Sequence, residues 1–356
     1  MVLFGGQSAE HEVSCVTAAS VLGAVDRDRY DIVPVGITPE GRWVIAEDAV
    51  AALAAGAKAL SPTGREIEPG AKGLAVTGQT VVLPLLHGPL GEDGTVQGML
   101  ELAGVPYVGT GVLGSALAMD KAKAREVFHD AGLPVARWLA RRDGLIEADL
   151  ARTVEDALGW PVFVKPSNMG SSVGVTKVKT AADLGAAVEH ALSYDEWVVI
   201  EEAVVGREVE CAVLGNLEPR ASVIGEIIPK AEFYDYDDKY SGDGAELVIP
   251  ADLPVEVSDR ARAIAIDAFR VVRAEGFARV DFFYEETGPS GERGRGLLLN
   301  EVNTIPGFTP LSMYPRLWDA TGVGYVELID ELVRLAVERH DRRNARRGRP
   351  RPQLGS

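Results

Sequence analysis

Two apolar stretches near the end of the sequence carry polar residues at alternate positions. Gly276–Phe283 reads Gly-Phe-Ala-Arg-Val-Asp-Phe-Phe, and Leu297–Gly307 reads Leu-Leu-Leu-Asn-Glu-Val-Asn-Thr-Ile-Pro-Gly. Because side chains alternate between the two faces of a strand, polar residues two positions apart share a face. We therefore expect a hairpin of two strands whose polar side chains meet. These side chains are Arg279, Asp281, Glu301 and Asn303.

The polar set on these strands has the composition of a magnesium site. Asp281, Glu301 and Asn303 offer two carboxylates and an amide oxygen, the hard oxygen ligands that Mg²⁺ binds together with phosphate and water. The strands read as buried, and a buried carboxylate requires a partner. A polar face on a half-exposed hairpin is the alternative, and the spacing alone leaves both interpretations open.

Composition limits the class of protein. With 356 residues, 46% of them hydrophobic, the chain can bury the cores of two or three domains. No apolar run approaches a membrane span and the N-terminus lacks the pattern of a secretory signal, so we expect a cytoplasmic protein without membrane contact. A formal net charge of −17 argues against a nucleic-acid partner, because phosphate binding needs a basic face.

Two further features are expected to be structural. Cys15 and Cys211 fit neither a disulfide framework nor a CxxC motif, so we expect both to be buried apolar residues. The run Arg339–Arg351 is basic and of low complexity. We expect residues 341–356 to form a disordered tail, and a solvated tail is favoured over a binding arm.

The first 110 residues alternate between strand and helix patterns. Val2–Phe4, Ile32–Ile37 and Thr80–Leu86 are predicted strands, and Ser14–Ala24 is a predicted helix. This alternation is typical of a parallel β-α-β sheet.

A glycine-rich stretch follows this region. Gly109–Gly114 matches the GxGxxG fingerprint of dinucleotide-binding proteins and precedes a predicted helix, Ser115–His129. A nicotinamide-dependent oxidoreductase is therefore an alternative, but no second strand ends in an acidic residue at the required distance. We favour a connection between domains.

A second glycine-rich stretch favours phosphate binding. The apolar strand Trp160–Pro166 contains Lys165 near its end, and Ser-Asn-Met-Gly-Ser-Ser-Val-Gly leads from it into a second strand, Val175–Val178. Backbone N–H groups at Gly170 and Gly174, the serine hydroxyls and the lysine would surround anionic oxygens. A plain surface hairpin is the alternative.

Carboxylates follow the next predicted strand. Trp197–Ile200 is apolar and leads into Glu201 and Glu202, with Glu208 a few residues later. Such carboxylates can bind the amine and ribose of a nucleotide, although charged strand ends are also common.

Two segments complete the C-terminal half. Phe233–Gly244 is polar and aromatic, which is the composition of an ordered active-site loop. Asp259–Ala274 is a predicted core helix, with Ser258 as its N-cap and Gly276 beyond its end.

Together these motifs resemble the ATP-grasp fold. The motifs are Lys165-Pro-Ser, Gly170-Ser-Ser-Val-Gly174, Arg279-Val-Asp281 and Asn300–Gly307. Within that superfamily the chain resembles the D-alanine–D-alanine ligase family, because further segments match it in order. These segments are Gly5–Ser14, Leu86–Leu100, Met119-Asp-Lys121 and Tyr234–Tyr240, and the resemblance covers roughly residues 2–335.

The resemblance implies a fold and a division of the chain. The implied fold is α/β with α+β character in the C-terminal half: a Rossmann-like N-terminal parallel sheet precedes two α+β domains that clamp ATP. The implied parts are residues 1–110, 111–204 and 205–340, followed by the tail 341–356. A homodimer is also implied.

Individual roles follow from the same resemblance. ATP contacts are implied for Lys121, Lys165, Ser172, Glu201, Glu202, Val204 and Glu208. Ligands of two Mg²⁺ ions, which Mn²⁺ can replace, are implied for Asp281, Glu301 and Asn303. Catalytic roles are implied for Glu10, Ser171, Tyr240, Arg279 and Gly307, and substrate binding for His87, Lys239, Ser312 and Met313.

In these roles Glu10 holds the ammonium group of the first D-alanine, and Tyr240 reaches Glu10 through Ser171. Arg279 and the Gly307 N–H form an oxyanion hole. The sequence departs from the family pattern at His11 and Leu311, and we expect neither change to abolish activity.

The implied reaction joins two D-alanines through a D-alanyl phosphate, releasing ADP and phosphate, for peptidoglycan precursor synthesis. In the family, a tyrosine at the position of Tyr240 accompanies a dipeptide product. A D-alanine–D-serine or depsipeptide ligase is the alternative among enzymes. A regulator that binds ATP without chemistry is the alternative from another class.

Overall fold

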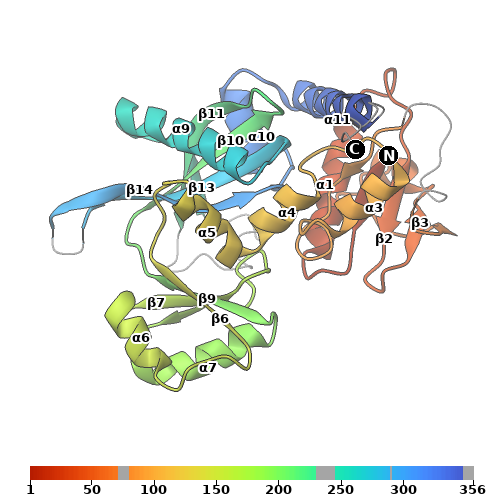
Figure 1. The fold of residues 1–356 in the computed structure, drawn as a ribbon. Helices are drawn as coiled ribbons and strands as arrows, with labels where there is room; N and C mark the ends of the chain where they lie inside the picture. The colour runs from red at the N-terminus through yellow and green to blue at the C-terminus, as the bar shows by residue number, and fades with distance from the viewer. Residues whose placement is uncertain (71–79, 230–244, 289–290, 348–356) are drawn as a thin grey trace, which may run out of the picture.

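The computed structural model describes residues 1–70, 80–229, 245–288 and 291–347. The strands of these residues form three sheets, of five, four and five strands. In Figure 1 the N-terminal sheet lies on the right, the C-terminal sheet at the upper left and the four-stranded sheet at the bottom. Within the described residues, none of the helices has both the length and the apolar character needed to cross a membrane.

The N-terminal sheet is mixed, and the parallel pairing at its centre agrees with the prediction. Its strands are β1 (Val2–Gly5), β2 (Pro34–Ile37), β3 (Trp43–Ile45), β4 (Arg65–Ile67) and β5 (Leu83–Pro84), in the order β4-β3-β2-β1-β5. The central strand β1 pairs in parallel with β2 and β5, and β3 and β4 are antiparallel additions. The helices of this part are α1 (His11–Ala24), α2 (Ala49–Ala54) and α3 (Thr95–Ala103).

Three predicted boundaries in this region are wrong. The strand predicted at Thr80–Leu86 is reduced to β5, since Pro84 has no N–H to donate to a ladder. The strand predicted from Ile32 begins at Pro34. Helix α1 begins at His11, earlier than predicted. Ser14 therefore lies inside the first turn, where its hydroxyl donates to the carbonyl of Leu85.

The predicted helix Ser115–His129 is two helices, α4 (Val112–Met119) and α5 (Lys121–Asp130). Asp120 separates them in an extended conformation, and its carboxylate caps α5 by accepting from the N–H of Lys123 at 3.0 Å. A Cβ built on Gly114 would lie 2.9 Å from the carbonyl oxygens of Val272 and Arg273. This glycine therefore serves close packing between helices.

The four-stranded sheet is antiparallel, in the order β6-β9-β7-β8. Its strands are β6 (Trp138–Arg142), β7 (Val162–Pro166), β8 (Thr176–Val178) and β9 (Trp197–Glu202), and its helices are α6 (Leu150–Ala157) and α7 (Ala181–Leu192). The hairpin predicted around residues 167–174 is confirmed, because β7 pairs directly with β8. Valine and isoleucine from the strands pack against leucines of the two helices.

The C-terminal sheet is also antiparallel, in the order β12-β11-β10-β13-β14. Its strands are β10 (Arg207–Gly215), β11 (Arg220–Pro229), β12 (Ala245–Val248), β13 (Gly276–Thr287) and β14 (Arg293–Asn303). The predicted core helix is α9 (Val255–Val271), which starts earlier than predicted because Pro254, not Ser258, occupies the N-cap. Its buried face consists of Ala261, Ile264, Ala265, Ala268 and Phe269.

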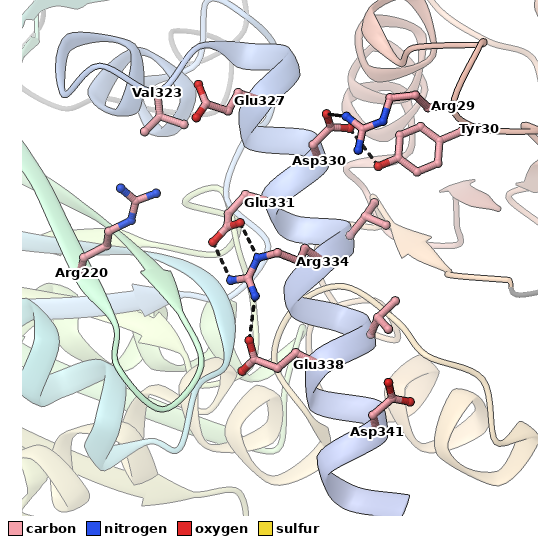
Figure 2. Close-up of a pocket in the computed structure, with 12 residues that line it drawn as sticks. Arg29, Tyr30, Arg220, Val323, Glu327, Asp330, Glu331, Arg334, Glu338 and Asp341 are labelled. Atoms are coloured by element: carbon pink, nitrogen blue, oxygen red, sulfur yellow. Dashed lines mark hydrogen bonds and ion pairs between the residues drawn. The ribbon is translucent and has the colours of Figure 1, made fainter.

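The last helices join the N-terminal and C-terminal parts. They are α10 (Met313–Ala320) and α11 (Tyr325–Arg347). From α11, Asp330 accepts a hydrogen bond from the Tyr30 hydroxyl at 2.9 Å and pairs with Arg29. A cavity of about 670 Å³ lies beside this contact (Figure 2), and its lining includes none of the predicted site residues.

The prediction of a disordered tail from residue 341 is wrong for its first seven residues, which are helical. Arg342 pairs with Glu275 and Arg343 with Glu101. The basic residues therefore find carboxylates on other elements, which a composition argument cannot anticipate. Residues 348–356 lie outside the described residues.

Both cysteines are buried, as predicted. Burial raises the pKa of the Cys15 and Cys211 thiols to about 12, so neither is a reactive thiolate at neutral pH.

Candidate active site

The predicted hairpin is formed by β13 and β14. Arg279 pairs in register with Asn303, and Asp281 pairs with Glu301. The Arg279 guanidinium donates to both carboxylate oxygens of Asp281, at 2.8 and 2.7 Å. Asn303 Nδ2 donates to Asp281 Oδ2 at 2.8 Å. The four side chains form one group, called here the hairpin cluster.

A residue that the sequence interpretation missed completes this face of the sheet. Strand β10 pairs with β13 on the other side, and Glu210 stands opposite Asp281. Glu210 Oε2 lies 3.0 Å from Arg279 Nε. Burial alone would lower the pKa of Arg279, but Asp281 and Glu210 outweigh it and raise that pKa well above its ordinary value. Glu208 and Glu210 stand two positions apart in β10, and this alternation could have indicated that Glu210 lies on the polar face of the sheet.

The hairpin cluster fits a magnesium ion. Two carboxylates and an amide lie on neighbouring strands, and rotating the Asn303 amide by half a turn would present its oxygen to the carboxylates in place of its nitrogen. In the described part of the chain, no group of three or more His, Cys, Asp or Glu residues is arranged to hold a metal. A divalent ion here would therefore depend on Asn303 and on further oxygens, as Mg²⁺ does when phosphate and water complete its shell.

A buried cation–carboxylate group lies on the neighbouring sheet. Lys165 Nζ, from β7, lies 2.5 Å from Glu201 Oε2 of β9. Arg125 of α5, also missed by the sequence interpretation, pairs with Glu201 and donates to the carbonyl of Asn300 at 2.7 Å. Burial lowers the pKa of Arg125 to about 10. Its spacing of four residues from Lys121 places both on one face of α5, which was a usable signal.

The loop between β7 and β8 folds onto the N-terminal part of the chain. Ser171 Oγ donates to Glu10 Oε1, although the two residues are 161 positions apart. A Cβ on Gly170 would lie 2.9 Å from Glu10 Oε2, so the close approach favours glycine. Lys121 Nζ donates to the carbonyl of Met169 at the start of the loop. The link between Ser171 and Glu10 agrees with the prediction, whereas Tyr240 and Lys239 lie outside the described residues.

Titratable groups surround Glu10. His87 is buried, and burial lowers its pKa despite the opposing charge of Glu10. Burial and the Glu10 charge raise the pKa of Glu92 well above its ordinary value, although its carboxylate accepts from the Gly88 N–H at 2.9 Å. Glu92 is a further residue that the sequence interpretation did not include.

Three further predicted residues lie near the start of α10. Ser312 is the N-cap residue of α10, and its hydroxyl accepts from the Thr309 N–H at 3.1 Å. Gly307 is close by, since a Cβ on it would lie 3.2 Å from Ser312 Oγ. The Met313 side chain points away into the core against Gly225, which leaves its backbone for a ligand.

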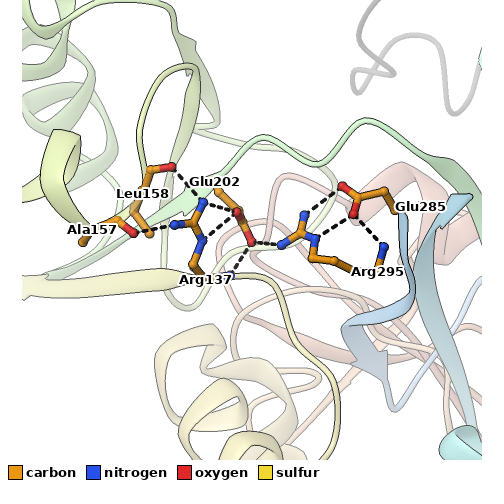
Figure 3. Close-up of polar contacts among 6 residues, drawn as sticks. All are labelled: Arg137, Ala157, Leu158, Glu202, Glu285 and Arg295. Carbon is orange, nitrogen blue, oxygen red and sulfur yellow. Dashed lines mark hydrogen bonds and ion pairs between the residues drawn. The ribbon is translucent and has the colours of Figure 1, made fainter. Parts of the chain in front are cut away.

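The nucleotide residues predicted along β9 and β10 are Glu201, Glu202, Val204 and Glu208. The structure places Glu201 next to Lys165. The Glu202 carboxylate is instead held by Arg137 and Arg295, as Figure 3 shows.

Comparisons with known proteins identify the class. Models described as the N-terminus and the C-terminus of D-ala D-ala ligase match residues 1–110 and 127–334. The chain has the ATP-grasp fold. It belongs to the D-alanine–D-alanine ligase family.

Individual relatives are similar over nearly the whole chain. The D-alanine–D-alanine ligase of Shouchella clausii is 48% identical, over 96% of this chain and 95% of the relative. The VanG D-Ala:D-Ser ligase of Enterococcus faecalis is 36% identical with a TM-score of 0.79, over 94% of this chain and 98% of that chain. The Bacillus anthracis D-alanine–D-alanine ligase complexed with ATP is 26% identical with a TM-score of 0.71, over 96% and 98%.

Proposed function

We propose that this protein joins two D-alanines to D-alanyl-D-alanine, at the expense of ATP, for peptidoglycan precursor synthesis. The contact between Ser171 and Glu10 is the observation that carries the proposal. It brings a carboxylate suited to an amino-acid ammonium group beside a loop suited to phosphate. The hairpin cluster and Lys165 lie on the strands that border the same region.

The chemistry requires activation of a carboxylate. In the first step an oxygen of the first D-alanine carboxylate attacks the γ-phosphorus of ATP, the bond to the β,γ-bridging oxygen breaks, and ADP leaves. Glu10 holds the ammonium group of this substrate, and Lys121 and Lys165 offset the charge on the transferring phosphoryl group. Two Mg²⁺ ions, held by Asp281, Glu301 and Asn303, would supply further charge neutralisation of the phosphates when bound.

In the second step the amine of the other D-alanine, after losing a proton, attacks the acyl carbon. The bond to the phosphate oxygen then breaks and phosphate leaves. Arg279 and the Gly307 N–H stabilise the oxyanion in between, and Ser312 with the Met313 backbone receives the second carboxylate. Water must be excluded because an acyl phosphate hydrolyses, and the loop of residues 167–174 covers the Glu10 side.

D-Alanine is the proposed second substrate, as the presence of Tyr240 leads us to expect. D-Serine is the second candidate, because the D-Ala:D-Ser ligase named above is 36% identical over almost the full chain. We also propose that the protein is cytoplasmic, that it forms a homodimer and that it binds no nucleic acid. We propose that its domains are residues 1–110, 111–204 and 205–340.

The test is phosphate release with ATP and each of D-alanine, L-alanine, D-serine and D-lactate, followed by the mass of the product. We expect phosphate release and a dipeptide with D-alanine. Equal turnover of L-alanine would overturn the assignment, and ATP binding without phosphate release would favour the regulator. A rise in melting temperature with NADH but not with ATP would favour the oxidoreductase.

A further inference from the structure

Two adjacent carboxylates at the end of β9 have different surroundings. Side chains alternate along a strand, so Glu201 and Glu202 point to opposite faces. Glu201 contacts Lys165 and Arg125 at the proposed phosphate end of the cleft. Glu202 contacts Arg137 and Arg295, which come from two different parts of the fold (Figure 3).

Both oxygens of Glu202 are engaged. Oε1 accepts from the Arg137 backbone N–H at 2.8 Å and from Arg295 Nη1 at 2.6 Å. Oε2 accepts from Arg137 Nε at 2.9 Å and Nη2 at 2.7 Å. The side chain of Glu202 is only 7% exposed, so these arginines replace the water that its carboxylate would otherwise bind.

Each arginine continues to a second anchor. Arg137 also donates to the carbonyls of Ala157 and Leu158, at the end of α6, at 2.9 and 3.1 Å. Arg295, on β14, forms a bidentate pair with Glu285 of β13, at 2.7 and 2.9 Å. We call Arg137, Glu202, Arg295 and Glu285 the sheet junction. It connects the four-stranded sheet to the C-terminal sheet.

The charges of the sheet junction cancel, since two guanidinium groups face two carboxylates. The arginines keep the pKa values of both carboxyls below their usual range despite burial. A balanced and hydrogen-bonded group requires no ligand to complete it. The junction is therefore suited to holding two sheets in place, and the Glu202 carboxylate is not available to a nucleotide amine.

We propose that Glu202 and Arg295 are positioning residues that fix the four-stranded sheet against the C-terminal sheet and so set the affinity for ATP. The proposal rests on the proposed function, because it takes residues 201–204 as the strand end that faces the nucleotide. The Glu202–Arg295 bond joins the two sheets that must enclose the ligand together. Loosening it lets the sheets separate, so that ATP binding must first bring them together.

Variants at both ends of the bond test the proposal. Arg295→Gln and Glu202→Gln should each raise the KM for ATP and the Kd for Mg²⁺·ATP about threefold to tenfold, with kcat within about twofold of wild type. In the double variant the loss of affinity should be smaller than the sum of the two single losses, because both changes remove the same Glu202–Arg295 bond. Arg295→Lys, which keeps the charge but loses the bidentate pair, should recover part of the affinity. Arg293→Gln, an exposed position on the same strand, is the matched control.

A merely structural role would lower the melting temperature of the variants without changing the Kd for ATP, and that result would overturn the proposal. A fall in kcat at unchanged KM would also overturn it. If Glu202→Gln does not fold, the half-exposed Arg295 variants carry the test alone. The Kd for Mg²⁺·ATP is measured by titration calorimetry. If the wild-type protein binds ATP but releases no phosphate with D-alanine, the proposed function is rejected. The Kd values of wild type and variants would still decide the present proposal.

Discussion

The hairpin cluster and the sheet junction both contain arginine and carboxylate side chains from β13 and β14, yet their charge balance differs. In the junction, two carboxylates face two guanidinium groups. In the row that contains the cluster, Asp281, Glu301 and Glu210 are carboxylates and Arg279 is the guanidinium. Three carboxylates on one row of the sheet are suited to an added cation, whereas in the junction each charge has a partner of opposite sign within the group. Charge balance thus separates a site for chemistry from a site for architecture.

The largest effect is expected where a carboxylate of the hairpin cluster is removed. Asp281→Asn should reduce D-alanine-dependent phosphate release by about 10³-fold or more, because the site loses a ligand charge for the cation that neutralises the phosphates. Asp330→Asn, the same change in the cavity of Figure 2, is the control and should leave turnover near wild type. Comparable rates for the two variants would mean that the cluster is a polar face without a metal.

Arg279 should show the next largest effect. Arg279→Gln should lower kcat by about 10²-fold or more, since the variant has no charge to stabilise the oxyanion. Steady-state rates at saturating ATP and D-alanine measure this, with the exposed Arg220→Gln as the control. A variant that changed only the KM for ATP would assign Arg279 to the binding function that we give to Arg295.

Glu210 should act through Arg279. Glu210→Gln keeps a hydrogen-bond acceptor but removes the charge that holds the guanidinium, so we expect kcat to fall about tenfold with little change in KM. In the Arg279→Gln background the same change should have no further effect. Additive losses in the double variant would show that Glu210 acts on something other than Arg279.

The sequence predicted the hairpin cluster because alternation along two strands is a local pattern. It placed Arg279, Asp281, Glu301 and Asn303 on one face, and the register confirms that placement. The parallel centre of the N-terminal sheet and the β7–β8 hairpin were likewise predicted from local patterns, whereas the antiparallel strands β3 and β4 were not predicted.

Features that depend on distant partners were not predictable. Ser14 reads as a helix start, but its hydroxyl bonds to Leu85, 71 positions away. Arg295 lies in a Gly-rich and Arg-rich interval that reads as a turn, and its partner Glu202 is 93 positions earlier. Helix α11 likewise continues into a basic run because carboxylates of other elements pair with it. The sheet junction could therefore be recognised only from the structure.

The smallest predicted effect concerns the pH dependence of the sheet junction. The folded-state pKa of Glu285 lies below its ordinary value of 4.5 through its hydrogen bonds with Arg295, so its ionised form stabilises the fold. That contribution is present above pH 4.5 and is lost as the pH falls through the folded-state value. Because Arg295 is 41% exposed, we expect the ionised Glu285 to contribute only about 1 kcal/mol to the free energy of unfolding.

Urea unfolding of wild type and Glu285→Gln at pH 6.5 and at pH 3.5 measures this contribution. The wild type should be the more stable protein at pH 6.5. The difference in unfolding free energy should be smaller at pH 3.5, because below pH 4.5 the carboxyl of the unfolded chain takes up a proton more readily than that of the folded protein. Glu331→Gln, which removes a carboxylate paired with Arg334 on the single helix α11, separates the junction from a pair within one element. For both variants the difference in unfolding free energy from wild type should become smaller at the lower pH. Only Glu285→Gln should also weaken ATP binding. Equal ATP affinity in the two variants would mean that the sheet junction stabilises the fold as an ordinary ion pair does. It would then have no separate role in ATP binding.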